Sequence, residues 1–270
     1  MRYDYPHYRL AKDPLSLVLC QVRYSKVRKM PEFMAEISDR LRSQGFPEDV
    51  SVTMQRVVFT PAGPQAQEAK IDEFRSKDHR WSLVIGEDAC ALLTSGYSTF
   101  AEFSSQLRKC MGIINEVAGL QHGQIHRVGI RYVDVIDPDQ GESFRDYLQD
   151  SLHGPKSSVI QASAQQLHLE SVGKTDLGTM IIRMTQNDQG IVIPPDIMMN
   201  SPLVYKMSPP LGKMITLLDS DHYAEHLFDY DLDRIVSLTD ELHQAINAAW
   251  FNDIITDHAK AKWEAQYVSP

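Results

Sequence analysis

The order of the expected secondary-structure elements constrains this fold most, because the same order occurs twice along the chain. In each half an apolar strand is followed by a helix, then by several strands, and finally by a long helix. The first strand falls at residues 15–24, and Thr99 and Glu102 have capping-box spacing at the start of the first long helix. The second half begins with a strand at 126–136 and closes with a helix at 232–256. We therefore predict an α+β fold, with a largely antiparallel sheet backed by long helices.

The chain has 270 residues, a length that fits either one large domain or two small ones. The repeated order favours two similar α+β halves, residues 1–122 and 123–270, which can also form one compact, pseudo-duplicated unit. Too few residues are identical between the halves to prove a duplication. Residues 61–80 are rich in Pro, Gln and charge, so we expect a long excursion there, with strand only around 71–74. The seam between the halves, where the strand at 126–136 begins, is the first place to look for a functional site.

Composition indicates an ordinary globular chain with a core of its own, since 43% of the residues are hydrophobic and 23% are charged. Asp and Glu total 36 against 27 Lys and Arg, and this acidic balance gives no general attraction to nucleic acid or to anionic membranes. The three cysteines form no CxxC pair, which suits a reducing cytosol. No stretch approaches the roughly 18 apolar residues of a membrane helix, and the start of the chain has no secretory pattern. We predict a cytoplasmic protein without membrane association.

One motif has the form of a catalytic metal site. His222, Glu225 and His226 spell HxxEH, in which two histidines on one helical face bind zinc and the glutamate activates the metal-bound water. Here the motif follows a strand pattern at 214–223 and precedes the last helix, so we expect its residues on a strand end and a loop. A chance match is the favoured interpretation, and a metal-dependent hydrolase is kept as an alternative.

A second metal candidate is the group of carboxylates at the end of the strand at 126–136, namely Asp134, Asp137, Asp139 and Glu142. Such oxygen-rich clusters can hold Mg²⁺ or Ca²⁺. Asp is also an ordinary turn residue, and the spacing lacks the pattern of a calcium loop, so we favour the turn interpretation. The chain has no G-x-G-x-x-G, no Walker loop and no G-x-S-x-G, and we predict no cofactor and no catalytic residue.

Arginine side chains give the best candidate for a positive site on this acidic chain. Strand alternation places Arg127 and Arg131 on one face of the strand at 126–136, and Arg56 lies on another expected strand. Two arginines on one face can clamp a phosphate or a partner's carboxylate, so a small-ligand or nucleotide sensor with a pocket between the halves is one hypothesis. An internal salt bridge is the favoured alternative.

Residues 194–212 are rich in Pro and Met and include Met198, Met199 and Met207. Adaptable Met side chains are common on surfaces that re-pack around partners, and this hypothesis predicts that all three are exposed. The alternative is a long inter-strand loop whose methionines cover the edge of the sheet. Both interpretations are kept.

Six short segments spread over nearly the whole chain carry a resemblance: 13–15 (DPL), 81–83 (WSL), 97–103 (YSTFAEF), 127–136 (RVGIRYVDVI), 218–221 (LDSD) and 251–257 (FNDIITD). Together they are similar to the pattern of an uncharacterised, sporadically distributed bacterial family of similar length. The resemblance implies that LDSD belongs to a strand, and it carries over no catalytic residue. By analogy only, a patchy distribution implies horizontal transfer and an accessory function such as phage defence or toxin control.

These observations predict a non-enzymatic binding or interaction protein. It engages a protein partner through the Met/Pro segment and the strand arginines, as an accessory of a mobile, phage-defence or toxin-control system. The alternatives are the HxxEH hydrolase and the small-ligand or nucleotide sensor. Homo-oligomer formation is left open.

Overall fold

The structure is a computed structural model that describes residues 8–60, 63–154, 167–197 and 203–267, with only the backbone described at 52–60 and 64–70. Its main element is one antiparallel sheet of ten strands. Nine of them follow each other across the sheet in this order: β3 (Glu48–Thr60), β4 (Gly63–Arg75), β5 (Trp81–Ile85), β6 (Ala89–Thr94), β2 (Leu15–Tyr24), β7 (Gln124–Ile136), β10 (Ile215–Ala224), β9 (Thr179–Asn187) and β8 (His168–Lys174). The tenth, β11 (Phe228–Asp229), pairs with the start of β7. The predicted α+β class with an antiparallel sheet is confirmed.

The centre of the sheet is the antiparallel pair β2 and β7, in which Cys20 lies opposite Ile130. Strands β6 to β3 extend from β2 on one side, and strands β10 to β8 extend from β7 on the other. Both central strands are covered on both faces over most of their length, which explains why they are nearly continuous apolar runs.

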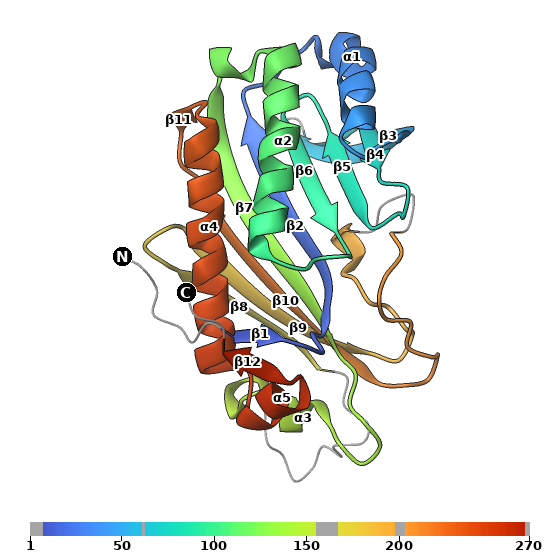
Figure 1. The fold of residues 1–270 in the computed structure, drawn as a ribbon, viewed down its shortest axis with the longest axis vertical. Coiled ribbons are helices and arrows are strands. Elements are labelled where there is room, and N and C mark those ends of the chain that lie inside the picture. The colour runs from blue at the N-terminus through green and yellow to red at the C-terminus, as the bar shows by residue number, and fades with distance from the viewer. Residues whose placement is uncertain (1–7, 61–62, 155–166, 198–202, 268–270) are drawn as a thin grey trace.

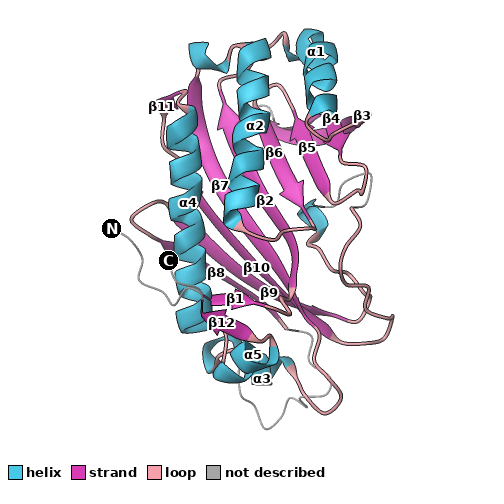
Figure 2. Cartoon of the chain, in the orientation of Figure 1, coloured by secondary structure: helices cyan, strands magenta, loops and turns pink. Residues whose placement is uncertain are grey.

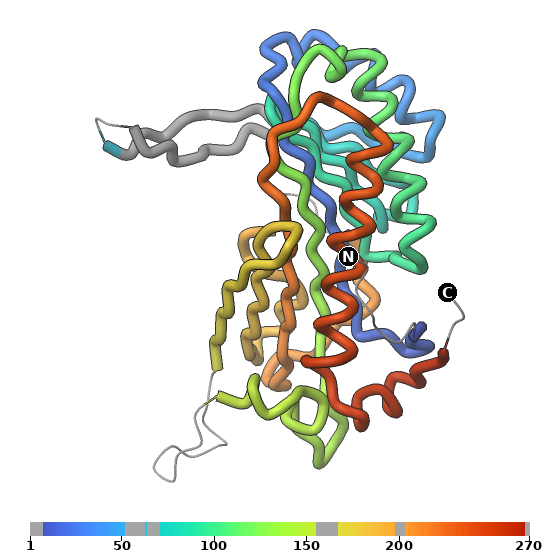
Figure 3. Tube along the Cα trace, turned by 90° about the vertical axis from the view of Figure 1, so that its left-hand side faces the viewer, coloured from blue at the N-terminus to red at the C-terminus, as the bar shows by residue number. Residues whose placement is uncertain are grey.

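Three helices, α1 (Met30–Ser43), α2 (Phe100–Ala118) and α4 (Leu232–Ala249), lie side by side on one face of the sheet (Figures 1 and 2). Seen along the sheet in Figure 3, they form a layer of their own. The predicted cap of α2 is present, because the Thr99 side chain accepts a hydrogen bond from the Glu102 backbone at 3.2 Å. Gly119 ends the helix with a left-handed φ of 69°. None of the helices in the described part of the chain combines the length and the apolar character that crossing a membrane requires.

The main core fills the space between this helix layer and the sheet, with Leu107, Ile114, Ile130 and Leu242 fully buried. A second apolar cluster lies at one end of the sheet, around the short helices α3 (Phe144–Tyr147) and α5 (Asp257–Lys262) and the π-helical turn η5 (Trp250–Ile254) that continues α4. A third cluster lies on the opposite face of the sheet, beneath the segment between β9 and β10. Short 3₁₀ turns occupy Leu120–His122 (η1), Asp150–Leu152 (η2) and Pro195–Ile197 (η4).

A small ribbon outside the sheet joins the two ends of the described chain. β1 (Tyr8–Leu10) pairs antiparallel with β12 (Ala265–Tyr267), next to the end of α4 (Figure 1). The expected excursion at 61–80 is wrong for its first part, because β4 pairs along the whole length of β3, with Val52 opposite Ile71. This partner supplies the backbone hydrogen bonds that make a strand of a sequence with little strand character.

Candidate functional site

Arg131 is buried in an ion-pair network on the face of the sheet opposite the helices. Its guanidinium donates to both carboxylate oxygens of Asp219, at 2.6 and 2.7 Å, and to both oxygens of Asp196, at 2.6 and 3.1 Å. Asp219, on the neighbouring β10, also accepts from Arg183 at 3.3 Å. Burial lowers the pKa of Arg131, but the hydrogen bonds to the two aspartates raise it above its ordinary value overall. Arg131 therefore forms the internal salt bridge that was the favoured alternative, and the two aspartates neutralise the charge of its guanidinium.

Arg127 points to the same face, as alternation predicts, and is also engaged. Its Nη1 donates to Gln21 at 2.9 Å, and its guanidinium lies 4.0 Å from the centre of the Tyr223 ring. Arg56 lies on β3, and strands β4, β5, β6 and β2 separate β3 from β7. The side chain of Arg56 lies outside the described residues. The structure therefore brings Arg127 and Arg131 together without placing the strand of Arg56 beside them.

The HxxEH residues lie on a strand end and a loop, as predicted. His222 is buried on β10, facing the helices, with Nδ1 3.2 Å from the Leu242 carbonyl oxygen and Nε2 2.8 Å from the Thr175 hydroxyl. Glu225 and His226 are exposed in the loop that follows. Both ring nitrogens of His222 are occupied, and burial lowers its pKa. Within the described ranges, no three His, Cys, Asp or Glu side chains gather closely enough to hold a metal ion.

The Met/Pro segment lies over the face of the sheet that carries the arginines. Met207 is half-buried and packs against the third apolar cluster, which includes Leu17 and Val133. This placement fits the interpretation in which the loop covers the sheet. Met198 and Met199 lie outside the described residues.

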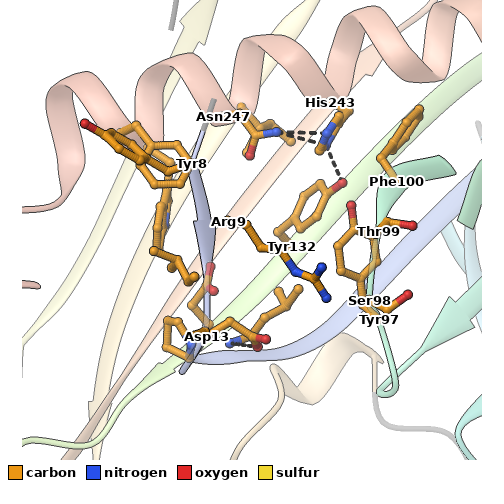
Figure 4. A pocket seen from close by; sticks show the side chains of 18 of the residues that line it. Tyr8, Arg9, Asp13, Tyr97, Ser98, Thr99, Phe100, Tyr132, His243 and Asn247 are labelled. Carbon is orange, nitrogen blue, oxygen red and sulfur yellow. Dashed lines mark hydrogen bonds between the residues drawn. The ribbon is translucent and has the colours of Figure 1, made fainter. Parts of the chain in front are cut away.

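A cavity of about 780 Å³ opens on the other face, between the start of α2 and the end of α4 (Figure 4). Its lining comes from elements far apart in sequence. Tyr132 and Asp134 come from β7, Tyr97 to Phe100 precede and begin α2, and β1 closes one side. The volume is typical of small-molecule sites. The cavity thus lies where the strand at the predicted seam meets both long helices.

A hydrogen-bonded network of neutral groups forms one wall of the cavity. The Tyr132 hydroxyl oxygen lies 2.6 Å from His243 Nδ1, and Asn247 Nδ2 lies 2.9 Å from His243 Nε2. Asn247 Nδ2 also lies 3.3 Å from Nδ1, so both ring nitrogens of His243 have hydrogen-bonding neighbours. Burial lowers the pKa of His243 to about 3 and raises that of Tyr132 well above its ordinary value, so both are neutral at pH 7. The imidazole of this wall is therefore not a free base.

Asp134 is the unusual polar residue of the cavity. Its side chain is only 5% exposed, and within the described residues no hydrogen bond or ion pair reaches its carboxyl group. Burial, followed by the nearby Asp13 and Asp219, raises its pKa well above the ordinary value. Lys206 does not neutralise it, because the ammonium group pairs with Asp13 at 3.2 Å.

Two donors of the lining are also without partners among the described residues. The buried indole Nε1 of Trp250 has no hydrogen-bond acceptor, and Trp250 begins the π-helical turn after α4. Such turns are frequent at functional sites. The Arg9 guanidinium forms no hydrogen bond or ion pair within the described ranges, and Figure 4 shows Arg9 reaching from β1 into the cavity.

Comparison with known proteins adds no assignment: no protein-family model and no curated protein matches the chain. Sequence reasoning placed Asp134 among turn carboxylates and Trp250 in the core, and it did not single out Tyr132, His243 or Asn247. The available signal was the spacing of His243, Asn247 and Trp250, which puts two polar residues on the apolar stripe of the last helix.

Proposed function

We propose that the protein is a non-enzymatic binding protein that holds a small organic ligand in the cavity between α2 and α4. The observation that carries this proposal is Asp134, a buried carboxyl group that faces the cavity without a partner. A buried polar group without a partner costs roughly 1–3 kcal/mol of stability, and more when charged. A ligand that hydrogen-bonds to Asp134 supplies the missing partner, which makes the cavity a preformed binding site.

Binding without catalysis is supported by the chemistry of the side chains. His243, the histidine of the cavity, is held neutral with both nitrogens engaged, so it cannot take up a proton near pH 7. The thiols of Cys20, Cys90 and Cys110 are buried, and burial raises the pKa of each. A thiol in such surroundings is a poor nucleophile.

An accessory role fits the same proposal. The resemblance to a sporadically distributed bacterial family supports, by analogy, a protein that senses a ligand and reports its presence to a protein partner in a defence or toxin-control system. We also infer that the halves 1–122 and 123–270 form a pseudo-repeat. Its support is the strand order, in which β6 lies beside β2 and β10 lies beside β7. The cavity would then lie at the seam of a duplicated unit.

The proposal is tested by blocking the cavity. Ser98 is an exposed residue of the lining, and Ser98→Trp fills the space beside it. Ser105→Trp places the same side chain on an exposed position of α2 that does not line the cavity. A panel of amines, carboxylic acids, amino acids and nucleosides is screened by ligand-observed NMR. We expect binding to the wild type and to Ser105→Trp that is lost in Ser98→Trp; the absence of any binding sensitive to Ser98→Trp contradicts the proposal.

A further inference from the structure

We propose that the cavity recognises a zwitterion, with an ammonium group bound by Asp134, a carboxylate bound by Arg9, and a flat apolar body between them. This inference rests on the proposed function and names its ligand class. The ligand class is that of amino acids whose ammonium and carboxylate groups are at opposite ends of the molecule.

The first step concerns the charged groups of the cavity lining that have no ion-pair partner within the described ranges. Charged side chains inside proteins are normally paired, and Lys206 and Asp13 of the lining are paired with each other. Arg9 and the ionised form of Asp134 are the lining groups of opposite charge that have no such pair within the described ranges. A ligand that satisfies both brings one cation and one anion.

The second step is the separation of the two groups. Asp134 lies on β7, in the middle of the large sheet, whereas Arg9 lies on β1, in the ribbon outside it. The two side chains form no ion pair with each other, although both line the same cavity. The two charged groups therefore lie farther apart than ion-pair distance, and one ligand that meets both carries its charges on separate groups.

The third step is the group of aromatic rings in the lining. The rings of Tyr97 and Tyr132 pack edge to face with centres 5.9 Å apart, and Phe100 stacks on His243 at 4.2 Å. Faces and edges of this kind hold a flat apolar body, and aromatic faces also favour an ammonium group.

The probe is 4-(2-aminoethyl)benzoate, with two isosteres that each lack one charge: 4-ethylbenzoate and 2-(4-methylphenyl)ethylamine. Affinities are measured by isothermal titration calorimetry for the wild type, Asp134→Asn and Arg9→Gln. We expect the zwitterion to bind more tightly than either isostere. Asp134→Asn weakens the zwitterion and the amine by about 10- to 100-fold and leaves the benzoate unchanged. Arg9→Gln weakens the zwitterion and the benzoate by roughly two- to fivefold and leaves the amine unchanged.

The control variant is Asp253→Asn, which removes an exposed carboxylate outside the cavity and is expected to change no affinity. Arg9 is exposed, so Arg9→Gln keeps the test open if Asp134→Asn fails to fold. L-Phenylalanine, with adjacent charges, is the remaining arm, and tighter binding of it than of the probe overturns the separated-charge assignment. If the probe and its two isosteres bind with equal affinity, or if none of the three binds, the assignment of a zwitterionic ligand is overturned. In that case, binding of other compounds from the panel that is lost in Ser98→Trp would still support the proposed function. If no compound shows such binding, the proposed function is overturned as well.

Discussion

The ring of Phe100, at the start of α2, stacks on the ring of His243, in the last turns of α4, with the two planes 6° apart. This contact joins the two long helices above the cavity and fixes the imidazole that contacts Tyr132. A stacked, buried imidazole is shielded from water, which is the cause of its low pKa. The contact between the two helices and the neutrality of the histidine therefore have one structural origin.

The first prediction concerns the pH dependence of stability. The His243 pKa of about 3 lies below the value of 6.5 for an unburied histidine. Below pH 6.5 the unfolded chain binds more protons, so His243 lowers the free energy of unfolding by roughly 1.4 kcal/mol per pH unit as the pH falls. His243→Gln should flatten this slope, measured by urea unfolding between pH 7 and pH 5. The exposed His226→Gln serves as control, and an unchanged slope in His243→Gln would show that folding does not lower the pKa of His243.

The second prediction concerns the ion pairs of Arg131. Arg131→Ala leaves the buried Asp219 with only the more distant Arg183, and we expect a loss of about 3 kcal/mol in the free energy of unfolding. Arg131→Met combined with Asp219→Leu should restore most of this loss, because the carboxylate that is left without Arg131, that of Asp196, is exposed to water. The exposed Arg23→Met, on the same face, is the control. Similar losses for Arg131→Ala and Arg23→Met would contradict the role of the network.

The third prediction concerns two glycines of the hairpin formed by β8 and β9. A Cβ at Gly178 would lie 2.0 Å from the Tyr223 carbonyl oxygen, whereas a Cβ at Gly173 would meet nothing within 4 Å. Gly178→Ala therefore pushes β9 away from β10 and should destabilise the protein by roughly 1–3 kcal/mol. Gly173→Ala should be neutral or slightly stabilising. Thermal unfolding of both variants checks this, and equal melting temperatures would rule out the close approach.

The fourth prediction concerns thiol reactivity. Burial raises the pKa of Cys20 and Cys110 to about 12 and that of Cys90 further, so none is a thiolate at pH 8. A thiol-specific disulfide reagent should label none of the three in the native protein and all three in urea. Rapid labelling of one thiol in the native state would indicate a reactive cysteine and weaken the non-enzymatic proposal.

The long helices and the central strands were predictable because their signals are local. The cap at Thr99 and the apolar runs of β2 and β7 are complete within a few residues. β4 was not predictable, because its strand state comes from pairing with β3 along its whole length. Part of the ion-pair network also depends on residues distant in sequence. Arg131 could be chosen from its own strand, but its partners on β10 and at Asp196 could not be predicted.

The cavity was predictable in position but not in composition. The cavity borders the strand at the predicted seam, yet the arginines chosen on that strand point to the opposite face from Tyr132 and Asp134. Alternation fixes which residues share a face, but the sheet order and the helix packing decide which face carries a cavity. His243 meets Tyr132 only because α4 crosses β7, and no local pattern contains that contact.

The fifth prediction concerns the proton balance of ligand binding. Burial, Asp13 and Asp219 raise the pKa of Asp134, and an ammonium group binds its ionised form. The other charged or titratable groups of the lining are Arg9, Lys206, Asp13, His243 and the phenols of Tyr8, Tyr97 and Tyr132; His243 stays neutral above its pKa of about 3. Binding of 4-(2-aminoethyl)benzoate should therefore release a proton and tighten as the pH rises towards the pKa of Asp134.

Calorimetry in two buffers with different ionisation enthalpies measures the released proton directly. Asp134→Asn should abolish the release, because an amide has no proton to lose, while Arg9→Gln should keep it. Proton release that persists in Asp134→Asn would assign it to another group of the cavity. Uptake of a proton by the wild type would mean that the ligand is held by its carboxylate beside a neutral Asp134, and the ammonium group would then have to bind elsewhere.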